Sequence, residues 1–166
     1  MYSKLEKELQ IRALQDSLSV IRKIAGWTME DLGEKIGVTK QTISNLENQK
    51  TQMNLTQYIA IRAVFDFEIQ NNKCNEILPE IIALLLDKKH EYSEVDQKKI
   101  DEATKTISAA AAGGINGAAL TSLSGSLLSS IVAGAAIGAP IGPVGMALGS
   151  IWLSKILNSK NGKDKK

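Results

Sequence analysis

The chain offers few side chains that could carry out covalent or metal chemistry. Cys74 is its single cysteine and His90 its single histidine. A disulfide or a cysteine-based zinc cluster needs several partners, and a catalytic site needs a nucleophile, a base and an orienting group. The sequence also contains no phosphate-binding loop of the Walker type. We therefore expect no enzyme activity, no metal and no cofactor.

Charged side chains are distributed unevenly along the 166 residues. The whole chain carries 20 basic and 18 acidic groups, a formal charge of +2, which demands no highly charged partner. Residues 106–154 are a run of 49 positions without any charged side chain. The composition divides the chain into an N-terminal domain over 1–70, a charged helical linker over 71–105, an uncharged segment over 106–158 and a basic tail over 159–166.

Apolar residues in the first 70 positions recur at helical spacing and predict four short helices. Gly26 is expected to end the first helix and Thr28 to cap the second. Gly37 allows the turn that follows, and Thr39 is expected to cap the third helix. The first part of the chain is thus predicted to be an all-α domain of four to five short helices.

Two further helices are predicted beyond this domain. One begins at about Glu76, with Pro79 in its opening turn, where proline is tolerated. The next follows Ser93, whose spacing to Asp96 resembles a capping box, and extends to about Ala112. The expected fold class is therefore all-α along the whole chain.

The second and third helices, with the turn at Gly37, predict a helix-turn-helix arrangement, whose second helix presents its first turns to the DNA major groove. Residues 21–50 resemble the DNA-binding domain of the phage repressor and Cro (Xre-like) family, and the match covers about residues 14–67. The pattern combines core spacing, a turn glycine and a buried acid, as Leu32, Gly37, Val38, Ile43, Leu46 and Glu47.

The resemblance implies double-stranded DNA as the partner and a role for particular side chains. The positions that it places at base edges are Lys40, Gln41, Thr42 and Asn45, and those near phosphates are Thr28, Asn48 and Lys50. Glutamine can pair bidentately with adenine, lysine suits guanine acceptors, and threonine offers a hydroxyl or a methyl group. The alternative is that these residues are only the solvated face of a surface helix.

The resemblance also places Arg22 opposite Glu47, which implies an internal ion pair between the first and third helices. Three features depart from the family pattern. Met29 stands where a glutamine is usual, Gln49 replaces the glycine after the recognition helix, and residues 51–54 lack basic groups. The departure at Gln49 predicts a strained or differently shaped turn.

Residues 12–70 contain seven basic and seven acidic groups. The sequence-independent part of DNA affinity should therefore be small for one copy, so we expect a homodimer or higher homo-oligomer. The neutral balance also leaves open that the domain is a protein-interaction module.

The uncharged run over 106–154 is long enough for two membrane crossings of about 20 residues with a turn. Small residues recur there at spacing four, as Gly113 with Gly117 and as Gly134, Gly138 and Gly142, which predicts close helix packing. The second set is similar in composition to glycine-zipper segments of small membrane-active bacterial peptides. A membrane hairpin, a soluble oligomerisation domain and a disordered tail all remain open.

The sequence favours a DNA-binding transcriptional regulator of bacterial or phage type, such as a repressor, with a C-terminal segment that anchors or oligomerises it. One alternative is a membrane-acting effector or immunity protein whose helix-turn-helix domain is a sensor. Another is an antitoxin-like autorepressor. The charged N-terminus lacks the apolar core of a signal peptide, so we expect a cytoplasmic protein, attached to the inner face of the cell membrane if residues 106–154 insert.

Overall fold

The structure is a computed structural model that describes residues 4–132. These residues contain helices and connecting turns and no strand, which confirms the expected all-α class. The helices are α1 (Lys4–Ile24), α2 (Met29–Ile36), α3 (Lys40–Glu47), α4 (Leu55–Asn71), α5 (Ile77–Ile82), the π-helix η1 (Ala83–Asp87), the 3-10 helix η2 (Lys89–Glu91), α6 (Glu94–Ala112) and α7 (Gly117–Val132).

The ends of the first three helices lie at the capping residues that the sequence predicts. Gly26 follows α1 with φ at 78°, and the side chain of Thr28 accepts a hydrogen bond from the backbone N–H of Asp31. Gly37 ends α2 in the left-handed region with φ at 75°, and Thr39 caps α3 through the N–H of Thr42. Local capping chemistry therefore sets the path of this part of the chain.

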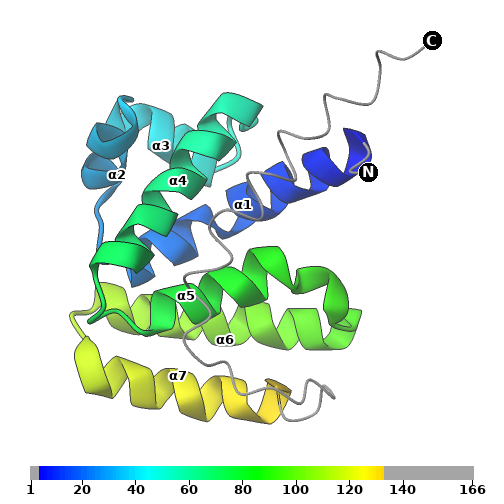
Figure 1. Cartoon of the computed structure of the whole chain (residues 1–166), viewed down its shortest axis with the longest axis vertical. Helices are drawn as coiled ribbons and strands as arrows, with labels where there is room; N and C mark the ends of the chain where they lie inside the picture. Colours follow the sequence, from blue (N-terminus) through cyan, green and yellow to red (C-terminus); the bar gives the residue numbers. More distant parts are fainter. Residues whose placement is uncertain (1–3, 133–166) are drawn as a thin grey trace.

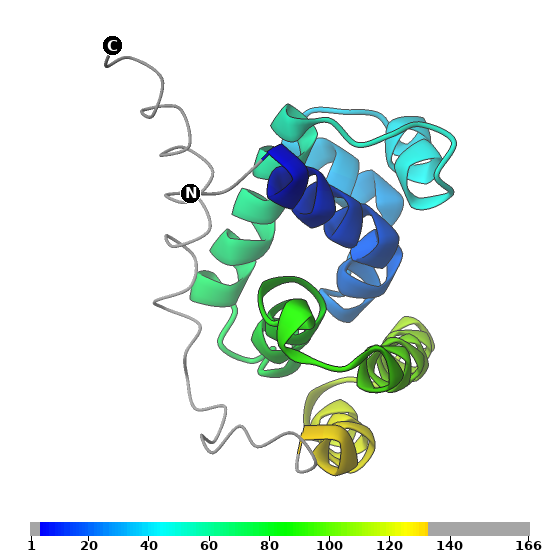
Figure 2. The same cartoon turned by 90° about the vertical axis from the view of Figure 1, so that its right-hand side faces the viewer.

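Helix α1 lies between two groups of helices (Figures 1 and 2). Helices α2, α3 and α4 are on one side of it, and α5, α6 and α7 are on the other. Leu14, Leu18 and Ile21 of α1 are completely buried between these groups. The helix is 21 residues long, and its first turns leave Leu5 and Leu9 exposed. The fold thus depends on α1 as the helix that both groups share.

The second group begins with helices that the sequence also anticipates. Pro79 lies in the first turn of α5, and Leu78 and Ile81 are completely buried. Helix α6 begins after Ser93, whose side chain accepts from the N–H of Asp96, and it ends at Ala112 as expected. Helix α6 therefore passes through residue 105, where the composition of the chain changes.

An ion pair that the sequence did not predict joins the two groups. Arg62 of α4 is 1% exposed, and its Nη2 donates to both carboxylate oxygens of Asp87 at 2.6 and 2.7 Å. Asp87 is the last residue of η1. The π-helical turn thus ends at the aspartate that meets the buried guanidinium.

Helix α7 packs against α6 at the end of the molecule away from α2 and α3 (Figure 2). Leu120, Leu128 and Ile131 of α7 are buried there. The expectation that Gly113 and Gly117 stack on one helix face is wrong, because Gly113 caps the end of α6 and Gly117 begins α7 with φ at 56°. Two separate helices meet at this short turn.

None of the helices over residues 4–132 combines the length and apolar character needed to cross a membrane. The predicted contact of Gly134, Gly138 and Gly142 and the basic tail over 159–166 lie outside the described residues, as does most of the expected C-terminal hairpin. The division of the chain into four units stays a prediction.

Candidate nucleic-acid interface

Helices α2 and α3 approach each other so closely that the turn between them admits little variation. The N–H of Val38 donates to the carbonyl of Gly33 at 2.9 Å. A Cβ atom at Gly33 would lie 2.6 Å from the carbonyl oxygen of Val38, which is closer than real Cβ contacts. The lack of a side chain at Gly33 and the left-handed conformation of Gly37 therefore fix the angle of the turn.

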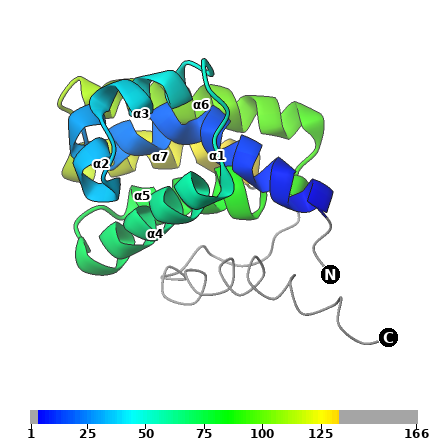
Figure 3. The same ribbon diagram turned by 90° about the horizontal axis from the view of Figure 1, so that it is seen from above.

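Helix α3 has one buried face and one exposed face. Ile43 and Leu46 are completely buried, and they attach the helix to α1. Lys40 and Gln41 are exposed, and Thr42 and Asn45 are half-buried. Figures 2 and 3 show α3 at the edge of the molecule, with no other described helix outside it. The four residues predicted to read bases thus lie on a helix that a large partner could approach.

Each of these four side chains has a neighbour that constrains it. The ammonium of Lys40 lies 3.6 Å from a carboxylate oxygen of Glu30 on α2. The hydroxyl of Thr42 lies 3.1 Å from that of Thr39. Gln41 and Asn45, one turn apart, are joined by a hydrogen bond of 2.9 Å from Nε2 to Oδ1. The exposed face is therefore a connected polar surface.

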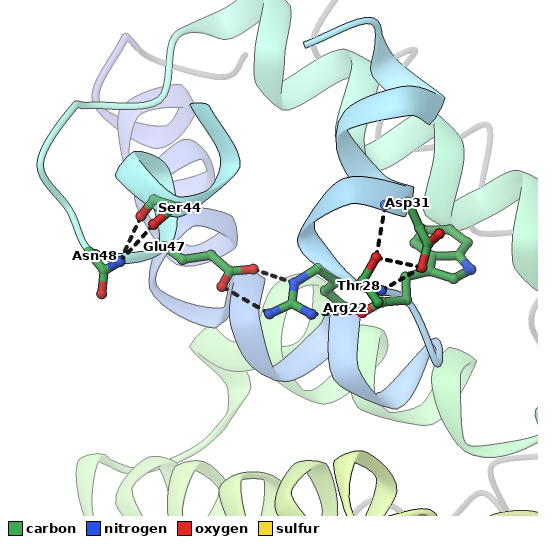
Figure 4. A network of polar contacts seen from close by, with 7 residues as sticks. Arg22, Thr28, Asp31, Ser44, Glu47 and Asn48 are labelled. Atoms are coloured by element: carbon green, nitrogen blue, oxygen red, sulfur yellow. Dashed lines mark hydrogen bonds and ion pairs between the residues drawn. The ribbon is translucent and has the colours of Figure 1, made fainter. Parts of the chain in front are cut away.

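The residues predicted to contact phosphates differ in what they have free to offer. The hydroxyl of Thr28 donates to Asp31 at 2.8 Å, so in this arrangement its hydrogen is already used (Figure 4). The amide of Asn48 donates to the carbonyl of Ser44 at 2.8 Å and contacts its hydroxyl at 3.3 Å. Lys50 is exposed and takes part in no ion pair among residues 4–132. Lys50 is thus the most available cation of the three positions.

A carboxylate already occupies the N-terminus of α2. Asp31 accepts from the backbone N–H of Thr28 at 2.7 Å, and this hydrogen bond, before the one from the Thr28 hydroxyl, lowers the pKa of Asp31. The carboxylate is therefore ionised at neutral pH beside the positive end of the helix dipole. A phosphate at this helix end would meet a negative charge.

Arg22 and Glu47 hold the recognition helix against α1 from within (Figure 4). Arg22 Nε donates to Glu47 Oε1 at 2.5 Å, and Nη2 donates to Oε2 at 3.0 Å. The two side chains are only 6% and 3% exposed. Arg22 Nη1 also donates to the carbonyl of Trp27 at 2.7 Å. The structure thus brings together the two residues that the family resemblance placed opposite one another.

Gln15 of α1, which sequence reasoning missed, holds the segment after α3. Its Nε2 donates to the carbonyls of Leu46 at 3.0 Å and Thr51 at 2.7 Å, and its Oε1 accepts from the N–H of Met53 at 2.9 Å. The three contacts span more than 30 positions in sequence. No local pattern could have predicted them, because they depend on the tertiary arrangement.

The turn after α3 shows the consequence of the departure at Gln49. Gln49 adopts φ of 56°, the only positive value at a residue other than glycine over residues 4–132. Its side chain donates to Asp16 Oδ1 at 2.8 Å. The left-handed conformation favours glycine, so this position is strained, while the side-chain hydrogen bond offsets part of the strain.

Trp27, between α1 and α2, packs in the domain core. Its ring stacks on Phe65 of α4 with a centroid distance of 5.3 Å and an interplanar angle of 5°. The ammonium of Lys35 lies 4.7 Å from the centre of the Trp27 ring. The aromatic pair joins the α1–α2 connection to α4 and supports the position of α2.

Known proteins resemble this part of the chain. Residues 18–70 match a family model described as Helix-turn-helix. Two curated relatives, both named Antitoxin HipB, come from Escherichia coli O6:H1 strain CFT073 and Escherichia coli strain K12. Each is 38% identical over 48 residues, an alignment that covers 29% of this chain and 51% or 54% of the relative. The chain therefore spans about half the length of these relatives.

No solved structure matches the chain. The match over residues 18–70 coincides with the capped helices and the turn described above. This part of the chain is a helix-turn-helix domain of the Xre-like family.

Proposed function

We propose that the protein is a sequence-specific transcriptional regulator that binds double-stranded DNA through α3. The observation that carries the proposal is the arrangement of α3. Its outer face exposes Lys40 and Gln41, while Arg22, Glu47 and Gln15 fix its inner face to α1. A rigidly held helix with exposed hydrogen-bonding groups suits insertion into the major groove.

Within this proposal, Lys40, Gln41, Thr42 and Asn45 contact base edges, and Thr28, Asn48 and Lys50 lie near phosphates. Thr28 would have to rotate its hydroxyl away from Asp31 to serve a phosphate, so we assign Lys50 the main phosphate contact. Replacing Lys50 with alanine should weaken binding to all sequences alike and lower the salt slope by about one. A changed base preference in Lys50→Ala would contradict this assignment.

The charge balance of the domain argues for a pair of copies on the DNA. Lys40 is partly neutralised by Glu30 at 3.6 Å, and Asp31 adds a negative charge at the start of α2. One copy therefore has little electrostatic attraction for the backbone. A homodimer would double the contacts and recognise two half-sites about 10 base pairs apart.

The similarity to Antitoxin HipB favours one particular kind of regulator, an antitoxin-like autorepressor. Such a protein would bind DNA upstream of its own gene and use other residues to bind a partner protein. The test is binding of the full chain to a duplex from its own promoter, compared with a scrambled duplex of the same composition. Equal affinity for both would argue against autorepression.

The C-terminal uncharged segment would anchor or oligomerise this cytoplasmic regulator. We propose that Gly134, Gly138 and Gly142 lie at a helix contact, in a membrane hairpin or in a homo-oligomer, because their spacing places them on one face of a helix. Gly138→Leu should then loosen association in sedimentation, measured in detergent if the protein partitions to membranes. Identical assembly of parent and variant would remove this proposal.

A further inference from the structure

The hydrogen bond between Gln41 and Asn45 bears on how the proposed interface would select a base. Gln41 Nε2 donates to Asn45 Oδ1 at 2.9 Å, between two residues one turn apart on the outer face of α3. Gln41 is exposed and Asn45 is half-buried, so the bond lies at the surface where DNA would dock. Gln41 belongs to the first turn of the helix, and Asn45 lies nearer to the protein.

An amide group uses both of its ends to recognise adenine. The carbonyl oxygen accepts from the adenine N6 amino group, and the amide nitrogen donates to N7. The nitrogen carries two hydrogens, so one can bond to Asn45 while the other remains for N7. The contact in the structure therefore does not consume the group that adenine needs.

The contact does fix the orientation of the amide. The terminal torsion of a glutamine is broad and roughly two-fold, so a free side chain exchanges the positions of its oxygen and nitrogen. A reversed amide would direct its donor at the N6 amino group of adenine and its acceptor at N7, and neither pair would bond. Holding the nitrogen on Asn45 removes the reversed state before DNA arrives, which lowers the cost of ordering the side chain.

We infer that Asn45 is a positioning residue that fixes the Gln41 amide so that α3 selects adenine at one base position. This inference rests on the proposed function, because it assigns roles within a DNA interface. It differs from the simpler assignment in which Asn45 itself contacts a base. The two assignments predict that replacing Asn45 changes the preference at different base positions.

The experiment is a binding-site selection from random duplexes with the full chain and four variants. Gln41→Ala first identifies the base position that Gln41 reads, where the preference for adenine should fall by about 5- to 150-fold. Asn45→Ala should reduce the preference at that same position by about 2- to 12-fold, since it frees one side chain that was ordered. The double variant should lose no more adenine preference than Gln41→Ala alone.

Asn45→Asp is the matched conservative variant. Its carboxylate oxygen can accept the same hydrogen bond, so the adenine preference should be kept. The added negative charge should weaken binding to all sequences alike. A residue that merely supported the fold would give no such separation of preference from affinity, and both side chains lie at the surface, so all four variants should melt with the parent.

The outcomes are distinct. Loss of adenine preference at the Gln41 position in Asn45→Ala, with retention in Asn45→Asp, supports the inference. A base other than adenine at that position, an unchanged profile in Asn45→Ala, or a change at a different base position overturns it while leaving DNA binding intact. If the parent chain selects no sequence at all, the proposed function falls, and this inference falls with it.

Discussion

Removing Glu47 should destabilise the domain more than the removal of any surface acid, because it leaves Arg22 buried without its carboxylate. The two side chains are 6% and 3% exposed and are joined by hydrogen bonds of 2.5 and 3.0 Å. Breaking a buried pair by removing one partner costs about 3–5 kcal/mol. Arg22 keeps its hydrogen bond to the carbonyl of Trp27 at 2.7 Å, so we expect a value near the lower end, about 3 kcal/mol.

The assay is urea unfolding of the full chain, followed by far-ultraviolet circular dichroism. With a slope of about 1–3 kcal/mol per molar urea, Glu47→Ala should lower the midpoint by about 1–3 M. Glu34→Ala is the matched control, because Glu34 is an exposed acid on α2 without an ion pair in the described part of the chain. The control should unfold at the midpoint of the parent.

A double variant separates the loss of the pair from the burial of a lone charge. Arg22→Met with Glu47→Leu replaces both charges by apolar groups of similar size. Such replacements are often neutral or stabilising, so the double variant should recover most of the loss. If Glu47→Ala unfolds at the same urea concentration as Glu34→Ala, the reasoning about this buried pair is wrong.

Three further changes test other features of the structure. Gln49→Gly should stabilise the domain by about 0.5–1 kcal/mol in urea unfolding, because it relieves the left-handed strain; destabilisation would mean that the hydrogen bond to Asp16 outweighs that strain. Ser124→Ala should raise stability by about 1–2 kcal/mol, because the buried Ser124 hydroxyl has no hydrogen-bond partner, and a loss of stability would show that this hydroxyl is satisfied. The pKa of Asp31 is lowered from 3.8 by its bonds to Thr28, so its contribution should be present above about pH 4 and lost as pH falls through the folded pKa; the stability gap between parent and Asp31→Asn should close in acid, and a constant gap would contradict the assignment.

The local parts of the fold could be predicted because capping and turn chemistry depend on neighbouring residues. Thr28, Thr39 and Ser93 cap their helices, and Gly37 takes the left-handed conformation. Proline at position 79 also lies in the first turn of its helix. Each of these features involves residues within about four positions of one another, so the sequence alone contains the necessary information.

The remaining features depend on contacts between distant parts of the chain. Arg62 and Asp87 are 25 positions apart, and the π-helical turn that ends at Asp87 has no local signature in the sequence. Gln15 reaches residues 31 to 38 positions away. The Arg22–Glu47 contact could be anticipated only because a family resemblance supplied the long-range information that periodicity lacks.

The candidate site shows the same division. The exposed positions on α3 follow from the spacing of Ile43 and Leu46, which are buried. The neighbours of those positions, such as Glu30 beside Lys40 on another helix, follow from the angle between α2 and α3. Sequence analysis could therefore name the residues of the interface but not the contacts that constrain them.

The most direct test of the central proposal is the ratio of affinities of the full chain for its selected duplex and for a scrambled duplex, measured at one fixed salt concentration. Specific DNA-binding proteins bind their sites about 10³- to 10⁷-fold more tightly than other DNA. We predict a ratio of at least about 10³, which falls when Gln41 is replaced by alanine. A ratio near one, or a high ratio that is the same in Gln41→Ala, would contradict the proposal that α3 reads the DNA sequence.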